Sequence, residues 1–276
     1  MHSVKFTTLF LIFFPIYLFA QDLNKDSLRF KTQDEKTVYV RAARFEKNIE
    51  EVRKQLIRAI KMVGVVTVPS SAALFFFGPM MTEALYFGIS LEDSRYIGQV
   101  LSALSLGLVA FSINLILIRG FNAFEDTRTQ VISILIINII SVALSYASLE
   151  FLDSQYVTIG LGVAFSVSYI VGLFVTLSLL KKHTGKLTFS TFAGHHAKLY
   201  IASILAMAPL FALVYFFEWE SADSSLILRA LRLGLILALS GALYLLFAKL
   251  FKVAEIATLA EFGRGLFKKR KGRLDP

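Results

Sequence analysis

Six long stretches without acidic or basic residues constrain the fold of this sequence more than any other feature. A helix rises about 1.5 Å per residue, so crossing a hydrocarbon core of about 30 Å takes about 20 apolar residues. Five stretches have roughly that length, and the sixth reaches it if its helix begins near Leu226 and carries Arg229 and Arg232 in its first turns. The six candidate spans are residues 62–82, 96–118, 129–149, 154–180, 199–217 and 226–248. The sequence therefore predicts an all-α fold, a polytopic transmembrane helix bundle with six full spans.

The composition agrees with a membrane protein and excludes several kinds of site. Of the 276 residues, 56% are hydrophobic and 18% are charged, and the charges gather in short connections between the apolar stretches. The net charge of +9 is spread over these connections rather than over one continuous face, so we expect no nucleic-acid partner. The chain has no cysteine, which excludes disulfides and thiolate metal sites.

The first 21 residues contain a shorter apolar run, from Phe6 to Gln21. Two interpretations are open, a cleaved signal peptide and a short spanning helix. Leu18 stands where a signal-peptide cleavage site requires a small residue, and Pro15 interrupts the run. We therefore expect a short, truncated spanning helix within residues 1–21.

Residues 22–61 are rich in charge, and apolar residues recur among them at helical spacing. This apolar stripe consists of Phe45, Ile49, Val52, Leu56 and Ile60. It predicts an amphipathic helix that lies along the membrane surface or packs under the bundle. No helix breaker separates this helix from the first span, so one continuous, bent helix is the alternative to two.

The connections between the spans alternate in charge and so predict an orientation. Acidic residues prevail in segments 83–95, 150–153 and 218–225, whereas segments 119–128, 181–198 and the tail from Lys249 carry arginines or lysines. Because basic loops stay in the cytoplasm, the acidic loops should lie outside and the C-terminus inside. The expected organisation is a cytoplasmic segment at 22–61, four spans at 62–180, a basic cytoplasmic loop at 181–198, two further spans at 199–250 and a basic cytoplasmic tail at 251–276. In this orientation segment 1–21 begins outside, as expected for the C-terminal part of a longer protein.

Polar and small residues within the spans indicate packing and bending rather than chemistry. Asn114 and Asn138 are amides that need hydrogen-bond partners on neighbouring helices, and Pro69 and Pro209 should each kink a helix because they lack a backbone donor. Small residues recur at every fourth position, which lets another helix approach closely. They are Gly160, Ala164, Ser168 and Gly172.

No catalytic constellation lies at membrane depth in this sequence. The spans contain no nucleophile with a neighbouring base, no paired carboxylates and no phosphate-binding glycine loop. His195 and His196 are adjacent and therefore point about 100° apart on a helix, which is unsuited to sharing a metal ion. We expect no catalytic residue, no metal and no cofactor, and hence not an enzyme.

The strongest local signal is the segment from Arg119 to Thr129, which joins two spans. Asp126 or Thr127 can cap the helix that follows, and the two arginines can meet lipid phosphates or Asp126 at the water boundary. The residues of this membrane-interface motif are Arg119, Phe121, Asn122, Asp126, Thr127, Arg128 and Thr129.

This motif resembles the MurJ/MviN family of lipid II flippases, within the multidrug/oligosaccharidyl-lipid/polysaccharide exporter superfamily. The resemblance rests on the arginine, the aromatic pair, the string Asp-Thr-Arg-Thr at 126–129 and an apolar helix with an internal Asn. The family usually has proline after this string, where this sequence has Gln130. The amphipathic helix, the acidic outer loop and the later spans follow in the same order as in the family, over nearly all of residues 5–270. Family members have about fourteen helices. This sequence resembles the eighth to the fourteenth of them, with the eighth truncated.

The resemblance implies transport of an undecaprenyl-linked peptidoglycan precursor across the bacterial plasma membrane by alternating access, without covalent chemistry. The expected partners are membrane lipids, this precursor and the missing N-terminal lobe, which in the family supplies most of a cationic cavity. The last two helices of the family border a groove for the lipid tail; contact with ordinary lipid is the alternative. The corresponding residues are Phe211, Tyr215, Phe216, Tyr244 and Phe247.

Two other functions stay open from the sequence. One is another exporter of the same superfamily, which carries drugs or polysaccharide-linked lipids. The other is an inactive membrane fragment or scaffold, because half of a transporter cannot enclose a pathway by itself.

Overall fold

The structure is a computed structural model that describes residues 35–86, 89–185, 187–216 and 226–256, with side chains from Ile49 onward. The expected short helix within residues 1–21 lies outside the described residues, as does most of the basic tail. The chain divides after Phe45 into two units. The described part of the first unit is the helical stretch 35–45, and everything that follows concerns the second unit.

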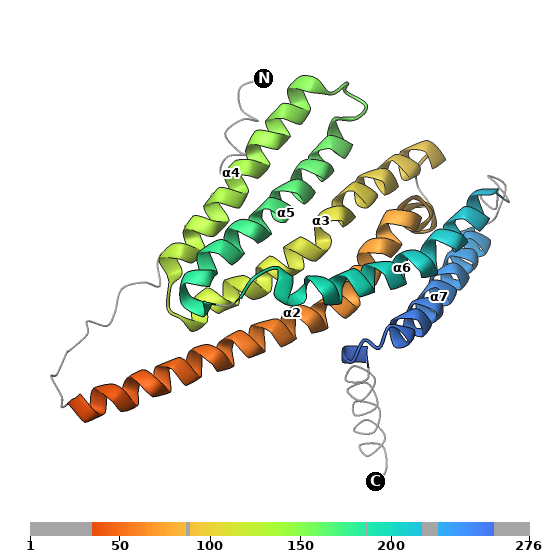
Figure 1. Ribbon diagram of the computed structural model, residues 1–276. Coiled ribbons are helices and arrows are strands. Elements are labelled where there is room, and N and C mark those ends of the chain that lie inside the picture. Colours follow the sequence, from red (N-terminus) through yellow and green to blue (C-terminus); the bar gives the residue numbers. More distant parts are fainter. Residues whose placement is uncertain (1–34, 87–88, 186, 217–225, 257–276) are drawn as a thin grey trace, which may run out of the picture. The chain divides into compact units, whose positions relative to one another are not determined.

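All regular structure in the described ranges is helical (Figure 1). The helices are α2 (Glu35–Leu85), α3 (Leu91–Ala123), α4 (Thr127–Phe151), α5 (Val157–Thr184), α6 (Ser190–Phe216) and α7 (Leu226–Leu250). Each contains a segment long and apolar enough to cross a membrane. The prediction of an all-α polytopic bundle with six spans is therefore confirmed, and the protein is a multi-pass membrane protein.

The amphipathic segment and the first span form one helix, α2. From Val52 onward its apolar stripe faces the bundle, since Leu56 and Ile60 are buried and Val52 packs against the core. Figure 1 shows that α2 changes direction in its last third. Pro69 and Pro79 both lie inside the helix, and each removes a backbone donor. The alternative of one bent helix is thus the observed arrangement.

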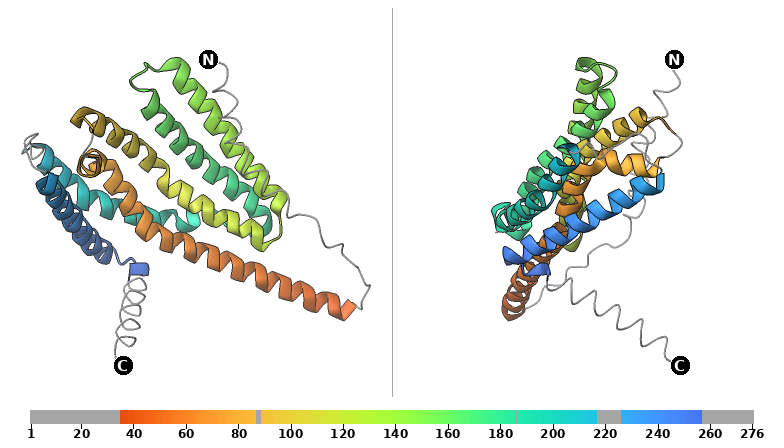
Figure 2. Two further views of the ribbon diagram at one scale, coloured as in Figure 1. Left: turned by 180° about the vertical axis from the view of Figure 1, so that it is seen from behind. Right: turned by 90° about the vertical axis from the view of Figure 1, so that its right-hand side faces the viewer.

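Helix α5 lies between α3 and α4 and packs along both (Figures 1 and 2). Small residues permit this close approach. On one side, Gly107 of α3 lies against Ser166, whose hydroxyl accepts from the Gly107 N–H at 2.9 Å. On the other side, Gly160 and Gly172 lie against α4, with Ile137 directly over Gly172. The small-residue face therefore receives α4, and a second set of small residues receives α3.

Helices α6 and α7 pack side by side, and each has a residue in contact with α2. The ring of Phe211 on α6 lies 5.6 Å from that of Phe76 on α2, and the hydroxyl of Tyr244 on α7 reaches the backbone of Val65. Buried residues of α2, α3, α5, α6 and α7 form one hydrophobic core. Helix α4 has the smallest buried share of the six spans, so the other described helices leave most of its apolar surface uncovered.

Candidate functional site

The segment between α3 and α4 is a tight turn anchored by Phe121. The Phe121 side chain is fully buried, and its carbonyl accepts hydrogen bonds from the N–H groups of Phe124 and Asp126, both at 3.1 Å. Glu125 has a φ of 56°, in the left-handed region, which reverses the chain before α4 begins. The turn thus fixes the direction in which α4 leaves α3.

Asp126 is the N-cap of α4, so of the two capping candidates it is the one that occupies the position. Its Oδ1 accepts from the N–H of Thr129 at 3.0 Å. The hydrogen bonds from Thr129 and the nearby His183 lower the pKa of Asp126 to about 2. The carboxylate is therefore charged at neutral pH and faces the positive end of the helix dipole.

His183, at the end of α5, is part of this site although no sequence pattern assigned it a role. Its Nε2 lies 2.7 Å from Oδ2 of Asp126, and its ring stacks on Phe124 with centroids 5.3 Å apart. The only hint in the sequence is that basic residues gather in the last turn of α5, where they favour the helix dipole. We call Phe124, Asp126, Thr129 and His183 the turn cluster.

The remaining motif residues divide between the turn cluster and the surface. Arg119, Asn122 and Arg128 are exposed, whereas Thr127 and Thr129 are half-buried. The structure therefore brings Asp126, Thr129 and His183 together and leaves the two arginines facing outward at the same end of the bundle. Exposed arginines at the end of a spanning helix are placed to meet phosphate groups.

The two asparagines expected inside the spans have different surroundings. Asn114 is 1% exposed, and its Nδ2 donates to the carbonyls of Ala110 at 3.0 Å and of Tyr169, on α5, at 3.1 Å. Asn138 is half-buried on α4. The Ser133 and Thr176 hydroxyls form a further buried hydrogen bond, from α4 to α5, at 2.7 Å. Polar groups within this part of the bundle thus join α5 to its two neighbours.

The two prolines expected to bend helices lie within α2 and α6, and a further one, Pro79, lies near the end of α2. A Cβ on Gly98 of α3 would overlap sterically with the backbone of Pro79. The backbone of α2 at Pro79 therefore lies directly against α3 at Gly98.

The five aromatic residues expected along a lipid-tail groove do not share one face. Tyr215 and Phe216 are 72% and 79% exposed, and Phe211 is exposed at its edge while it touches Phe76 and Phe77 of α2. Phe247 is half-buried against the core. Tyr244 is only 5% exposed and lies against α2.

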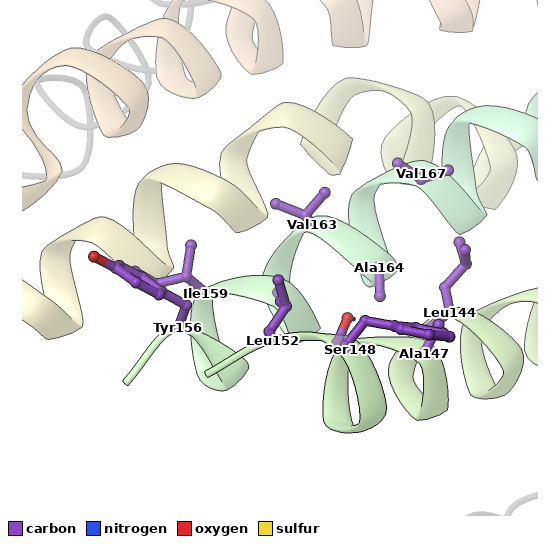
Figure 3. A pocket seen from close by; sticks show the side chains of 11 residues that line it. Leu144, Ala147, Ser148, Leu152, Tyr156, Ile159, Val163, Ala164 and Val167 are labelled. Atoms are coloured by element: carbon purple, nitrogen blue, oxygen red, sulfur yellow. The ribbon is translucent and has the colours of Figure 1, made fainter. Parts of the chain in front are cut away.

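An apolar groove of about 480 Å³ lies between α4 and α5 on the side of their acidic connection (Figure 3). Figure 3 shows side chains from both helices facing it. Its lining includes Leu144, Ser148, Leu152, Tyr156, Gly160 and Val163. The Ser148 hydroxyl donates to the Leu144 carbonyl at 3.0 Å, so this serine is engaged within its own helix. The groove suits a hydrocarbon chain better than a polar ligand. Among the described residues, no three His, Asp or Glu side chains converge as metal ligands would.

Comparison with known families gives these features a context. The family model described as "Lipid II flippase MurJ" matches residues 41–230, well over half of the chain. This chain belongs to the MurJ family. The match covers α2 to α6, the turn cluster and the start of α7. The family is one of membrane transporters rather than catalytic enzymes.

A curated MurJ relative, named "Probable lipid II flippase MurJ", comes from Rhizobium tropici. It is 26% identical over 229 residues, which cover 81% of this chain and 41% of the relative. The chain thus spans about two fifths of the length of the MurJ relative that it matches. No solved structure matches the chain.

Proposed function

We propose that this chain supplies the helices of one lobe of a lipid II flippase in the bacterial inner membrane. The observation that carries the proposal is the MurJ family match over residues 41–230, on a chain with six membrane-spanning helices. The substrate would be an undecaprenyl-linked peptidoglycan precursor that moves from the inner to the outer leaflet. The other lobe would come from helices such as those of the Rhizobium tropici relative that this chain does not match.

Transport by alternating access needs moving helices and no covalent chemistry. Two features of the described residues support this mode. The bent helix α2 carries two prolines in its interior and α6 carries Pro209, and a bend at such a proline can open and close a cavity. Small residues bring α5 close to both α3 and α4, and hydrogen bonds join α5 to each of them, so these three helices can move as one body.

The loop charges support an orientation with the turn cluster and the C-terminus in the cytoplasm. Lys181, Lys182 and Lys198 lie near this end of the bundle, together with Arg119 and Arg128. Basic residues flanking spans are retained in the cytoplasm. In this orientation the two arginines would contact lipid phosphates of the inner leaflet, where the precursor is loaded.

Of the five aromatic residues expected to contact the lipid tail, those on α6 are exposed and can contact a hydrocarbon chain. Phe211, Tyr215 and Phe216 all reach the surface. We propose that the polyprenyl tail contacts these three residues, whereas Tyr244 is buried against α2 and does not contact the tail.

The proposal is tested by complementation of a bacterium depleted of its own lipid II flippase. The chain is expressed alone, together with the unmatched part of the Rhizobium tropici relative, and in a form with Arg119→Ala and Arg128→Ala. The relative's part alone and an empty vector are the controls. Growth that depends on the chain supports the proposal.

A chain that inserts into the membrane but never restores growth, with or without the second part, would contradict it. Vesicles reconstituted with the same proteins then separate the alternatives. Movement of another polysaccharide-linked lipid would indicate a related exporter, and no movement of either lipid would indicate a scaffold.

A further inference from the structure

Pro69 leaves a backbone acceptor without its normal partner in the middle of α2. In an α-helix the carbonyl of residue 65 would accept from the N–H of residue 69. Proline has no N–H, so the Val65 carbonyl loses this hydrogen bond. Val65 and Val68 are 4% and 0% exposed, so water has little access to this position. A buried acceptor of this kind needs a replacement donor.

The replacement comes from α7. The Tyr244 hydroxyl donates to the Val65 carbonyl at 2.8 Å, across 179 residues of sequence. Tyr244 is itself 5% exposed, and a buried tyrosine hydroxyl normally needs a partner of its own. One hydrogen bond therefore satisfies two buried groups that would otherwise be unpaired.

We propose that Tyr244 is a positioning residue whose hydroxyl replaces the hydrogen bond that Pro69 removes from Val65, and which thereby fixes α7 against the proline-containing turn of α2. The bend of α2 and the position of α7 are then coupled through this single contact. The coupling follows from the described contacts alone; only its effect on transport rests on the proposed function.

This assignment differs from simple packing in one respect that can be measured. If Tyr244 served only to fill space, removal of its hydroxyl would change the stability equally whether or not residue 69 is proline. If the hydroxyl compensates for Pro69, its removal should cost less stability when a residue with a backbone N–H stands at position 69. The two residues must therefore show a strong interaction in a double-mutant cycle.

The first experiment measures the melting temperature of the full chain, purified in detergent. Tyr244→Phe should lower it by about 4 °C, because a buried carbonyl is left unpaired. Tyr146→Phe is the matched control, since Tyr146 is 67% exposed on α4, and it should leave the melting temperature unchanged. In a Pro69→Ala background, Tyr244→Phe should lower the melting temperature by less than half as much. An equal fall in both backgrounds overturns the proposal.

A second measurement serves if Pro69→Ala does not fold. An isotope-edited infrared spectrum of the protein with ¹³C=¹⁸O valine at position 65 reports the hydrogen bond directly. Tyr244→Phe should shift this carbonyl band to higher frequency, and Tyr146→Phe should not. An unmoved band in Tyr244→Phe overturns the proposal.

Complementation adds a readout that depends on the proposed function. Tyr244→Phe should reduce growth rescue, and Pro69→Ala should partly restore it in the double variant. If the unaltered chain gives no rescue, the proposed function fails while the melting and infrared results still decide the role of Tyr244.

Discussion

The imidazole Nε2 of His183 lies 2.7 Å from Oδ2 of Asp126, although 57 residues separate them in sequence. The contact ties the last turn of α5 to the turn between α3 and α4. Because Asp126 also caps α4, one carboxylate links the ends of three helices. The stacking of His183 on Phe124 adds a second contact between the same elements. The turn cluster is therefore expected to hold α4 at a fixed angle to α3 and α5.

Replacement of Asp126 by alanine should destabilise the protein by about 1–2 kcal/mol, since it removes the cap of α4. The same change also leaves His183 without its carboxylate partner. The unfolding free energy of the detergent-solubilised protein measures this loss. Glu125→Gln is the control, because Glu125 is the exposed neighbour of Asp126 in the same turn. Equal stability of the Asp126→Ala variant and the unaltered protein would show that the turn cluster contributes nothing.

Acid should weaken the contribution of Asp126 within a defined range of pH. The folded-state pKa of about 2 lies below the ordinary value of 3.8, so folding favours the charged carboxylate. The stabilisation is therefore complete above about pH 4 and is lost as the pH falls through about 2. Asp126→Asn keeps a capping side chain but does not titrate. The difference in stability between the unaltered protein and this variant should shrink as the pH falls from about 4 to about 2; a difference that grows over this range would contradict the assignment.

The six spans could be predicted because membrane insertion depends on local sequence. A run such as 154–180 has no charge to hold it in water, and α5 extends little beyond it. The continuity of α2 was also visible, since no breaker separates Ile60 from the first span. Of the two prolines inside α2, only Pro69 was predicted to bend the helix, because Pro79 stands close to the end of the apolar run, where a kink and a helix end look alike.

The candidate site was harder to predict from the sequence, because its contacts join residues that are far apart in the chain. Asp126 could be identified as one of two candidate caps from its position before an apolar helix, whereas His183 could not be paired with it by any spacing. Tyr244 has the same difficulty: an aromatic residue on a spanning helix looks like a lipid contact until its neighbour is known. The Tyr244 hydroxyl, which Phe247 lacks, can be assigned a role only once the structure shows that it lies beside the proline-containing turn of α2.

The two span asparagines should respond differently to truncation. Asn114→Ala should cost about 1 kcal/mol of stability, because it removes the hydrogen bond from α3 to the Tyr169 carbonyl of α5. Asn138→Ala should change stability by less than about 0.5 kcal/mol, since Asn138 is half-buried on the helix that has most lipid contact. The free energies of unfolding of both variants, measured in the same detergent, test this difference. A larger loss for Asn138→Ala would indicate that α4 is held by polar contacts rather than by small-residue packing.

Gly64 should tolerate no side chain, because α6 places His196 directly against it. A Cβ at Gly64 would lie 2.6 Å from His196 Nε2, and this histidine is buried and hydrogen-bonded through Nδ1 to the Phe192 carbonyl, so its ring cannot swing away freely. Gly64→Ala should therefore destabilise the protein by about 1–3 kcal/mol. Gly194→Ala is the matched control: it lies in α6 with open space around it and should be neutral or stabilising by up to about 1 kcal/mol. Melting curves of the two variants test this prediction. If Gly64→Ala melts no lower than Gly194→Ala, the close contact between α2 and α6 at Gly64 is absent in solution.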